Sequence, residues 1–252
     1  RGSPPASASP DAAAPGVRGR SPVWRRAAIG DRGARAPDPM TRKPPPRGAV
    51  VLAGGQSTRM GRDKASLPFG DRPLIAHVVQ ALARAVSEIV LVARRGQALP
   101  DVGALPSHVT LRRAYDETEG QGPLGGLAPG LRALAAPVAF VTGCDAPFVT
   151  PAFVGAVFAA LGDADAALPF VGGRLHPLSG AYRREAALAA TEALLAAGRL
   201  RALGVFEAVR GVRVLEAALR AVDPELRSLE NVNDPETYEA AVRRYRTRPP
   251  AS

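Results

Sequence analysis

Residues 50–64 read VVLAGGQSTRMGRDK, an apolar run that ends in two adjacent glycines, Gly54 and Gly55. The apolar run is typical of a buried strand. A glycine-rich turn at the end of a strand leaves backbone N–H groups free to bind an anion. Arg59 and Lys64 add two positive charges to the same segment. The stretch therefore predicts a phosphate-binding loop, and the order of its residues favours a nucleoside triphosphate.

The spacing of this loop excludes two common phosphate-binding motifs. A Walker A loop has four residues between its glycines and a lysine after the second glycine. Here five residues separate Gly55 from Gly61, and Arg62 follows. The dinucleotide fingerprint needs a Gly-x-Gly-x-x-Gly triple that opens a helix, and the segment has no such triple.

Downstream of this loop, strand patterns alternate with helix patterns. We expect strands at 48–53, 88–93, 109–114, 138–142, 165–170, 177–182 and 212–215, with the fifth and sixth joined through Gly172 and Gly173. We expect helices at 73–86, 123–134, 151–161, 185–197 and 235–245. Continuous apolar strands separated by helices predict a three-layer α/β fold, in which helices flank a mostly parallel sheet.

Two aspartates follow predicted strands, where ligands of such sheets bind. Asp145 follows the strand at 138–142 after Gly143 and Cys144, and a carboxylate there can hold Mg²⁺ together with substrate phosphates. A turn or cap aspartate is the alternative for this position. Asp116 follows the strand at 109–114, and taken alone it is better explained as a solvated side chain than as a functional one.

Composition divides the chain into a tail and one domain. Residues 1–46 are rich in Pro, Ala, Gly, Ser and Arg, which predicts disorder. We expect one folded domain at 47–246 and a flexible end at 247–252. The tail holds nine basic and three acidic residues, so it carries +6 of the formal charge of +10. The modest positive charge that remains on the rest of the chain suits a domain that binds phosphorylated ligands, and it gives no reason to expect nucleic acid. One hypothesis is that Met40 is the true start.

Other composition features bear on the compartment and on metals. One cysteine fits a reducing compartment, so we expect a cytoplasmic protein. No apolar run approaches the roughly 20 residues of a membrane span, so we expect no membrane partner. Three histidines and one cysteine do not favour a zinc site. His176 is more simply structural than a general base, and Cys144 is read as a small buried residue.

A nucleotide, Mg²⁺ and no evident covalent nucleophile favour direct nucleotidyl transfer. The cationic loop and the metal offset the charge that develops on the transferring phosphate and on pyrophosphate. An acceptor phosphate is already ionised at neutral pH, so it needs no general base.

The motifs together resemble those of molybdenum cofactor guanylyltransferases. The first motif runs from Leu52 to Ala65, and weaker ones follow at 122–126, 144–148, 173–177 and 231–235, so that the resemblance covers about residues 48–245. It implies a nucleotide-diphospho-sugar transferase-like fold, with GTP and molybdopterin-bound molybdenum cofactor as substrates and Mg²⁺ as cofactor. It also implies transient molybdoenzyme or chaperone partners. We expect a monomer.

The resemblance assigns roles to residues at these motifs. Catalysis is assigned to Arg59, Lys64 and Asp145, with Asp145 as the metal ligand. Substrate contacts are assigned to Leu52, Ala53, Gly54, Gly55, Lys64, Asp116 and Asp145 on the nucleotide side and to Asn231 and Asn233 on the pterin side. The two asparagines have an alternative role as caps of the last helix. The family's nucleotide-contacting Asn after the second strand is absent, and Arg94 stands in that region.

Two alternatives stay open from the sequence. A cytidylyltransferase would act on the same pterin with CTP, but it typically has Leu-Ala-Ala-Gly where this chain has Gly54 at the third position. A nucleotide- or RNA-binding protein without turnover is the other alternative, supported mainly by the basic tail. A sugar-1-phosphate nucleotidyltransferase would leave Asn231 and Asn233 unexplained.

Overall fold

The computed structural model describes residues 2, 45–54, 63–116, 118 and 120–247 of the 252-residue chain. Most of the expected disordered tail and of the expected C-terminal end lies outside these residues, as do Gly55 and Arg59 of the predicted loop. The fold described below belongs to the compact unit Lys43–Ser252.

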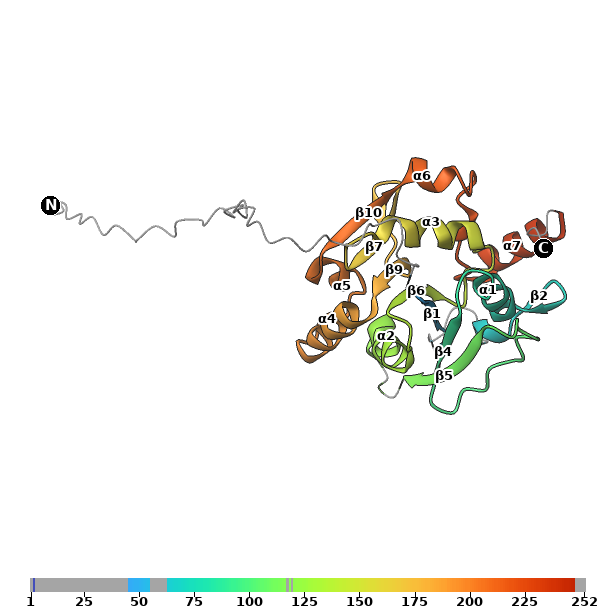
Figure 1. Cartoon of the computed structure of the whole chain (residues 1–252), viewed down its shortest axis with the longest axis horizontal. Helices are drawn as coiled ribbons and strands as arrows, with labels where there is room; N and C mark the ends of the chain where they lie inside the picture. The colour runs from blue at the N-terminus through green and yellow to red at the C-terminus, as the bar shows by residue number, and fades with distance from the viewer. Residues whose placement is uncertain (1, 3–44, 55–62, 117, 119, 248–252) are drawn as a thin grey trace, which may run out of the picture. The chain divides into compact units, whose positions relative to one another are not determined.

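The core of this unit is one mixed sheet (Figure 1). From edge to edge it contains β10 (Gly211–Leu215), β7 (Ala166–Val171), β9 (Ser179–Arg183), β6 (Val138–Gly143), β1 (Arg47–Leu52), β4 (Glu88–Arg94) and β5 (Thr110–Asp116), with β8 (Arg174–Leu175) paired to β7. β9 runs antiparallel to both of its neighbours, and the pairs β10–β7, β6–β1, β1–β4 and β4–β5 are parallel. The carboxyl ends of β1, β4, β5 and β6 therefore meet at one edge.

Alternate residues of the buried strands pack into separate hydrophobic clusters on the two faces of the sheet. Ala49 and Val51 of β1 join a cluster with α1 (Leu74–Leu82) and α3 (Pro151–Leu161), while Val50 joins one with α2 (Gly122–Ala133), α4 (Arg184–Ala196) and α5 (Leu203–Ala208). Figure 1 shows α1 and α3 on one side of the strands and α2 and α4 on the other. The fold is the predicted three-layer α/β arrangement.

Helix α2 contains four glycines, and two of them allow it to pack closely against the sheet. A Cβ on Gly126 would lie 3.2 Å from the Leu52 side chain, and one on Gly130 would lie 2.5 Å from Val50 Cγ1. Pro123 stands in the first turn, where its missing N–H costs nothing. The close packing fixes the start of α2 beside the carboxyl ends of β1 and β5.

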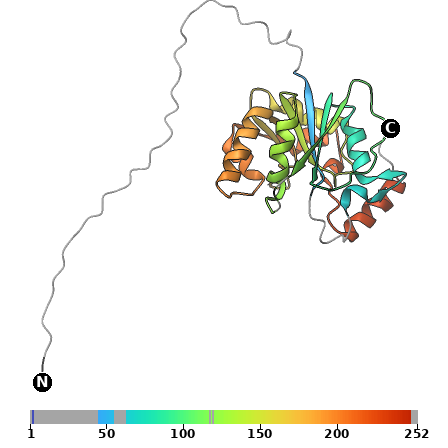
Figure 2. The same cartoon turned by 90° about the horizontal axis from the view of Figure 1, so that it is seen from below.

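A third cluster joins the C-terminal helix α7 (Pro235–Thr247) to the short hairpin β2 (Pro68–Phe69) and β3 (Arg72–Pro73). Phe69 is fully buried there, with ring centroids 5.2 Å from His77 and 4.9 Å from Tyr245. In Figure 2 the red α7 lies beside the cyan segment of this hairpin. The cluster holds the segment before α7, which carries Asn231 and Asn233, against the domain.

Most expected elements are present, with boundaries shifted by a few residues. The helix expected at 73–86 ends at Leu82 and the one at 235–245 continues to Thr247. Gly172 and Gly173, both with positive φ, join β7 to the short strand β8, which was not expected, and β9 follows β8 and pairs with both β6 and β7. The sequence reading missed the 3-10 helices η1 (Lys64–Ser66) and η2 (Arg227–Leu229), the β2–β3 hairpin, α5 and α6 (Glu216–Arg220), all of them short. Among the described residues, no helix is long and apolar enough to cross a membrane.

Candidate functional site

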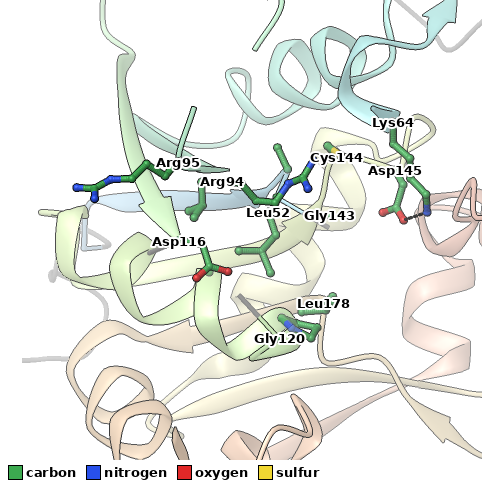
Figure 3. A pocket seen from close by; sticks show the side chains of 16 residues that line it. Leu52, Lys64, Arg94, Arg95, Asp116, Gly120, Gly143, Cys144, Asp145 and Leu178 are labelled. Carbon is green, nitrogen blue, oxygen red and sulfur yellow. Dashed lines mark hydrogen bonds and ion pairs between the residues drawn. The ribbon is translucent and has the colours of Figure 1, made fainter. Parts of the chain in front are cut away.

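A cavity of about 550 Å³ opens at the carboxyl ends of β1, β4, β5 and β6 (Figure 3). It is lined by the residues that end these strands and by the start of α2, including Leu52, Ala53, Gly54, Lys64, Asp116 and Asp145. Figure 3 shows Asp116 toward one end of the cavity and the Lys64–Asp145 pair toward the other. The cavity occupies the place where ligands bind in open α/β sheets.

Three predicted site residues meet at one end of this cavity. Lys64 Nζ donates a hydrogen bond to Asp145 Oδ2 at 3.3 Å and another to Asn233 Oδ1 at 3.0 Å. The side chains of Lys64 and Asp145 are 18% and 22% exposed. The ammonium group is thus held between a carboxylate at the end of β6 and an amide before α7, while remaining accessible to a ligand.

Asp145 is held through its backbone by the segment before α7, and its side chain lies over a nearby glycine. Its backbone carbonyl accepts a hydrogen bond from the N–H of Val232 at 2.8 Å, which ties the end of β6 to the segment before α7. Its carboxylate folds back over Gly143, where a Cβ would collide with Asp145 Oδ1. Gly143 is therefore required by the position of the Asp145 side chain, a requirement that the sequence analysis did not identify.

Asp116 ends β5 at the other end of the cavity. Burial raises the pKa of the Asp116 carboxyl above its ordinary value, and a hydrogen bond from the N–H of Thr118 at 3.1 Å acts in the opposite direction. The carboxylate lies against α2, since a Cβ on Gly125 would be only 2.9 Å from Asp116 Oδ2. A half-buried carboxylate beside an apolar wall is suited to accept hydrogen bonds from a nucleobase.

The wall between these two ends contains Arg94, at the end of β4. Its side chain passes over Gly54, where a Cβ would lie 3.2 Å from Arg94 Cγ. Its Nε is buried without a hydrogen-bond partner. In Figure 3, Arg94 extends across the cavity, whereas Arg95 extends to the opposite side. A buried polar group without a partner is costly, so Arg94 is a candidate to contact a bound anion.

The two asparagines of the C-terminal motif differ in their surroundings. Both are exposed and neither lines the cavity, but Asn233 Oδ1 accepts the hydrogen bond from Lys64. The cap of the last helix is Asp234, whose Oδ1 accepts a hydrogen bond from the N–H of Thr237 at 2.8 Å. The capping alternative for the asparagines is therefore wrong, because the adjacent aspartate fills that role.

His176 and Cys144, the two other reactive side chains considered in the sequence, have structural roles. His176 is half-buried and does not line the cavity, and burial lowers the pKa of its imidazole. Cys144 lines the cavity but is 5% exposed, and burial raises the pKa of its thiol. A thiol with a raised pKa is a poor nucleophile.

Comparison with known proteins connects this chain to a family. The model of the MobA-like NTP transferase domain matches residues 49–212. A probable molybdenum cofactor guanylyltransferase from Mycobacterium avium is 39% identical over 191 residues, which cover 73% of this chain and 89% of that protein. Another from Methanothermobacter thermautotrophicus is 36% identical over 192 residues, which cover 74% and 94% of the two chains.

Solved structures show the same fold at lower identity. Molybdopterin-guanine dinucleotide biosynthesis protein A from Archaeoglobus fulgidus has a TM-score of 0.65 and 23% identity, over 80% of this chain and all of that one. A 2-C-methyl-D-erythritol 4-phosphate cytidylyltransferase from Thermus thermophilus has a TM-score of 0.57 and 19% identity, over 79% and 98% of the two chains.

Proposed function

The chain belongs to the MobA-like NTP transferase family, and we propose that it transfers GMP from GTP to the phosphate of molybdopterin-bound molybdenum cofactor. The products are the guanine dinucleotide form of the cofactor and pyrophosphate. The observation that carries the proposal is the meeting of Lys64, Asp145 and Asn233 at one end of the cavity. These residues come from three separate motifs of the resemblance.

The reaction needs charge stabilisation more than proton transfer. An oxygen of the acceptor phosphate forms a bond to the α-phosphorus of GTP, and the bond from that phosphorus to the bridging oxygen breaks. The electron pair of the broken bond leaves with pyrophosphate. Lys64 lies where it can neutralise part of the charge on the phosphates, since its ammonium is only partly buried at the cavity wall. Arg94 adds a second cation along the same wall.

The residues at the end of β6 also fit Mg²⁺. Among the described residues no group of three or more His, Cys, Asp or Glu side chains forms a protein cage for a metal. Mg²⁺ does not need one, because it is commonly held by one or two carboxylates together with substrate phosphates and water. Asp145 supplies such a carboxylate at the cavity wall. When bound, the ion would neutralise charge on the phosphates and orient them.

The base and the acceptor would lie at opposite ends of the site. Asp116 can accept hydrogen bonds from the ring N–H and the amino group of guanine, groups that cytosine does not present in the same arrangement. Asn233 and the exposed Asn231 lie on the side of Asp145, where we place the pterin. We also propose that the enzyme acts as a cytoplasmic monomer and passes its product to a molybdoenzyme or chaperone.

The test is pyrophosphate release by the full chain supplied with Mg²⁺, molybdenum cofactor and either GTP or CTP. We expect turnover with GTP, the guanine dinucleotide cofactor detected by mass spectrometry, and far slower turnover with CTP. Equal turnover with CTP, or none with either nucleotide, would refute the proposal.

A pair of variants separates an enzyme from a nucleotide-binding protein without turnover. Asp145→Ala should abolish pyrophosphate release while the fold persists. Glu192→Ala is the matched control, because it removes a carboxylate that pairs with Arg132 at 2.6 Å on the exposed surface. It should leave turnover unchanged. An unchanged rate in Asp145→Ala would exclude the role assigned to this carboxylate.

A further inference from the structure

The side chain of Gln97 links three parts of the site wall. Its Oε1 accepts a hydrogen bond from the N–H of Arg94 at 2.9 Å. Its Nε2 donates to the carbonyl of Ala53 at 3.1 Å and to Asp63 Oδ2 at 2.8 Å. The Gln97 side chain therefore uses both N–H donors of its amide, and its oxygen accepts one hydrogen bond.

The backbone around Gln97 is built to hold it there. Residues 94–97 form a tight turn in which the N–H of Gln97 donates to the carbonyl of Arg94 at 3.0 Å. Gly96 has a φ of +77°, a conformation that glycine adopts without strain. Gln97 and Arg94 are therefore joined by two hydrogen bonds. One runs from the Gln97 N–H to the Arg94 carbonyl, and the other runs from the Arg94 N–H to the Gln97 side chain.

Asp63 passes this constraint on to Lys64. Asp63 Oδ2 is held by Gln97, and Asp63 Oδ1 accepts from the N–H of Ala65 at 3.0 Å, which caps η1. Lys64 is the first residue of η1, and Ala65 is fully buried beside it. Because η1 is a single turn with little hydrogen bonding of its own, its position depends on this cap.

We propose that Gln97 is a positioning residue of the transfer reaction, which sets where Lys64 stands by holding Asp63 against the ends of β1 and β4. The proposal rests on the guanylyl transfer proposed above. Ala53 is held by two hydrogen bonds. Its N–H donates to the carbonyl of Val92 at 2.8 Å, and its own carbonyl accepts from Gln97 Nε2. Through Asp63, Gln97 thus fixes the position of Lys64 relative to the rigid parallel strands. An amide suits this role because it supplies donors to a carboxylate and a carbonyl without adding a charge beside the phosphates.

Two variants and a matched control test this role at a temperature where circular dichroism shows each protein folded. Gln97→Leu removes all three side-chain bonds, and we expect kcat with GTP to fall at least tenfold, with a smaller change in KM. Gln80→Leu is the control, because Gln80 Nε2 also donates to two backbone carbonyls, those of Val102 at 2.9 Å and Ala104 at 3.0 Å. Gln80 does not line the cavity, so kcat should stay within twofold of the wild type.

Gln97→Glu supplies a readout that depends on the chemistry of the amide. The introduced carboxylate would face the Ala53 carbonyl and the Asp63 carboxylate, which raises its pKa. Protonation restores one donor, so the kcat of Gln97→Glu relative to wild type should rise as the pH falls. The ratio for Gln97→Leu should not change with pH.

Failure of this proposal and failure of the proposed function give different results in these experiments. Absence of turnover in the wild type overturns guanylyl transfer itself. Wild-type turnover with kcat of Gln97→Leu within twofold of Gln80→Leu overturns the role of Gln97. If Gln97→Leu does not fold, the pH dependence of Gln97→Glu decides, and a ratio that does not change with pH overturns the role.

Discussion

The replacement Gly143→Ala should strongly lower the kcat of the enzyme while leaving its fold nearly intact. Gly143 is the last residue of β6, and an added Cβ would occupy the space of Asp145 Oδ1. Gly143 does not have a positive φ, so alanine fits the backbone there. The strain therefore falls on the Asp145 carboxylate, which must rotate away from Gly143, and this rotation also shifts the Oδ2 atom that contacts Lys64.

The expected sizes of the two effects differ widely. Loss of the partly exposed Lys64–Asp145 pair costs about 0.2–1 kcal/mol of unfolding free energy. Alanine in place of glycine restores about 0.4–1 kcal/mol by restricting the unfolded chain. The net change in stability is therefore close to zero. A displacement of about 1 Å in a reacting group can lower the rate about 100-fold, so kcat should fall by roughly that factor.

Two measurements check this prediction. Pyrophosphate release with GTP and molybdenum cofactor gives kcat, and urea denaturation gives the free energy of unfolding. Gly155→Ala is the matched control, because a Cβ there meets no atom within 4 Å. It lies in α3, where alanine is favoured over glycine by about 0.5–1 kcal/mol. A Gly143→Ala enzyme with kcat within twofold of wild type would refute the reasoning, especially where Asp145→Ala is inactive.

Three further predictions concern binding and pH. Arg94→Ala should raise the KM for GTP severalfold with little change in stability, because the guanidinium has a buried Nε without a protein partner; steady-state kinetics check this. Asp116→Asn should weaken GTP binding in calorimetry. It should not lower stability at pH 7, because burial raises the pKa of Asp116 and so favours its neutral form in the folded state; any gain should vanish below the ordinary aspartate pKa of about 3.9. Burial lowers the pKa of His77, so stability should fall as the pH drops below about 6.5, and this fall should be smaller in His77→Gln in pH-dependent urea denaturation.

Much of the fold was predictable because its strands are buried on both faces. Continuous apolar runs such as 138–142 mark these strands, and the intervening helices imply parallel connections. The short elements were missed for a physical reason: α5, α6 and the β2–β3 hairpin are too short to show a hydrophobic period. Their formation depends on packing, as for Phe69 in the cluster with His77 and Tyr245.

The candidate site was predictable as a set of chemical groups and only partly as an arrangement. Asp145 and Asp116 follow strands, so their place at one edge of the sheet followed from the rule for parallel sheets. Asn233 was expected from the resemblance on the pterin side, and the structure also places it against Lys64. Gly143 and Gln97 carry no motif of their own, so no pattern indicated that one makes room for a carboxylate and the other holds Asp63.

The sequence by itself determined the α/β class and the carboxylates at strand ends, and it predicted a cationic glycine-rich segment at 54–64, because these depend on local periodicity and on the type of each residue. The tertiary structure alone decided which groups touch. Lys64 meets Asp145 across 81 positions of the chain and Asn233 across 169, and Gln97 reaches Ala53 across 44. Hydrogen bonds at such separations exist only once the strands and helices have packed, since no local pattern encodes the direction of a side chain across the sheet.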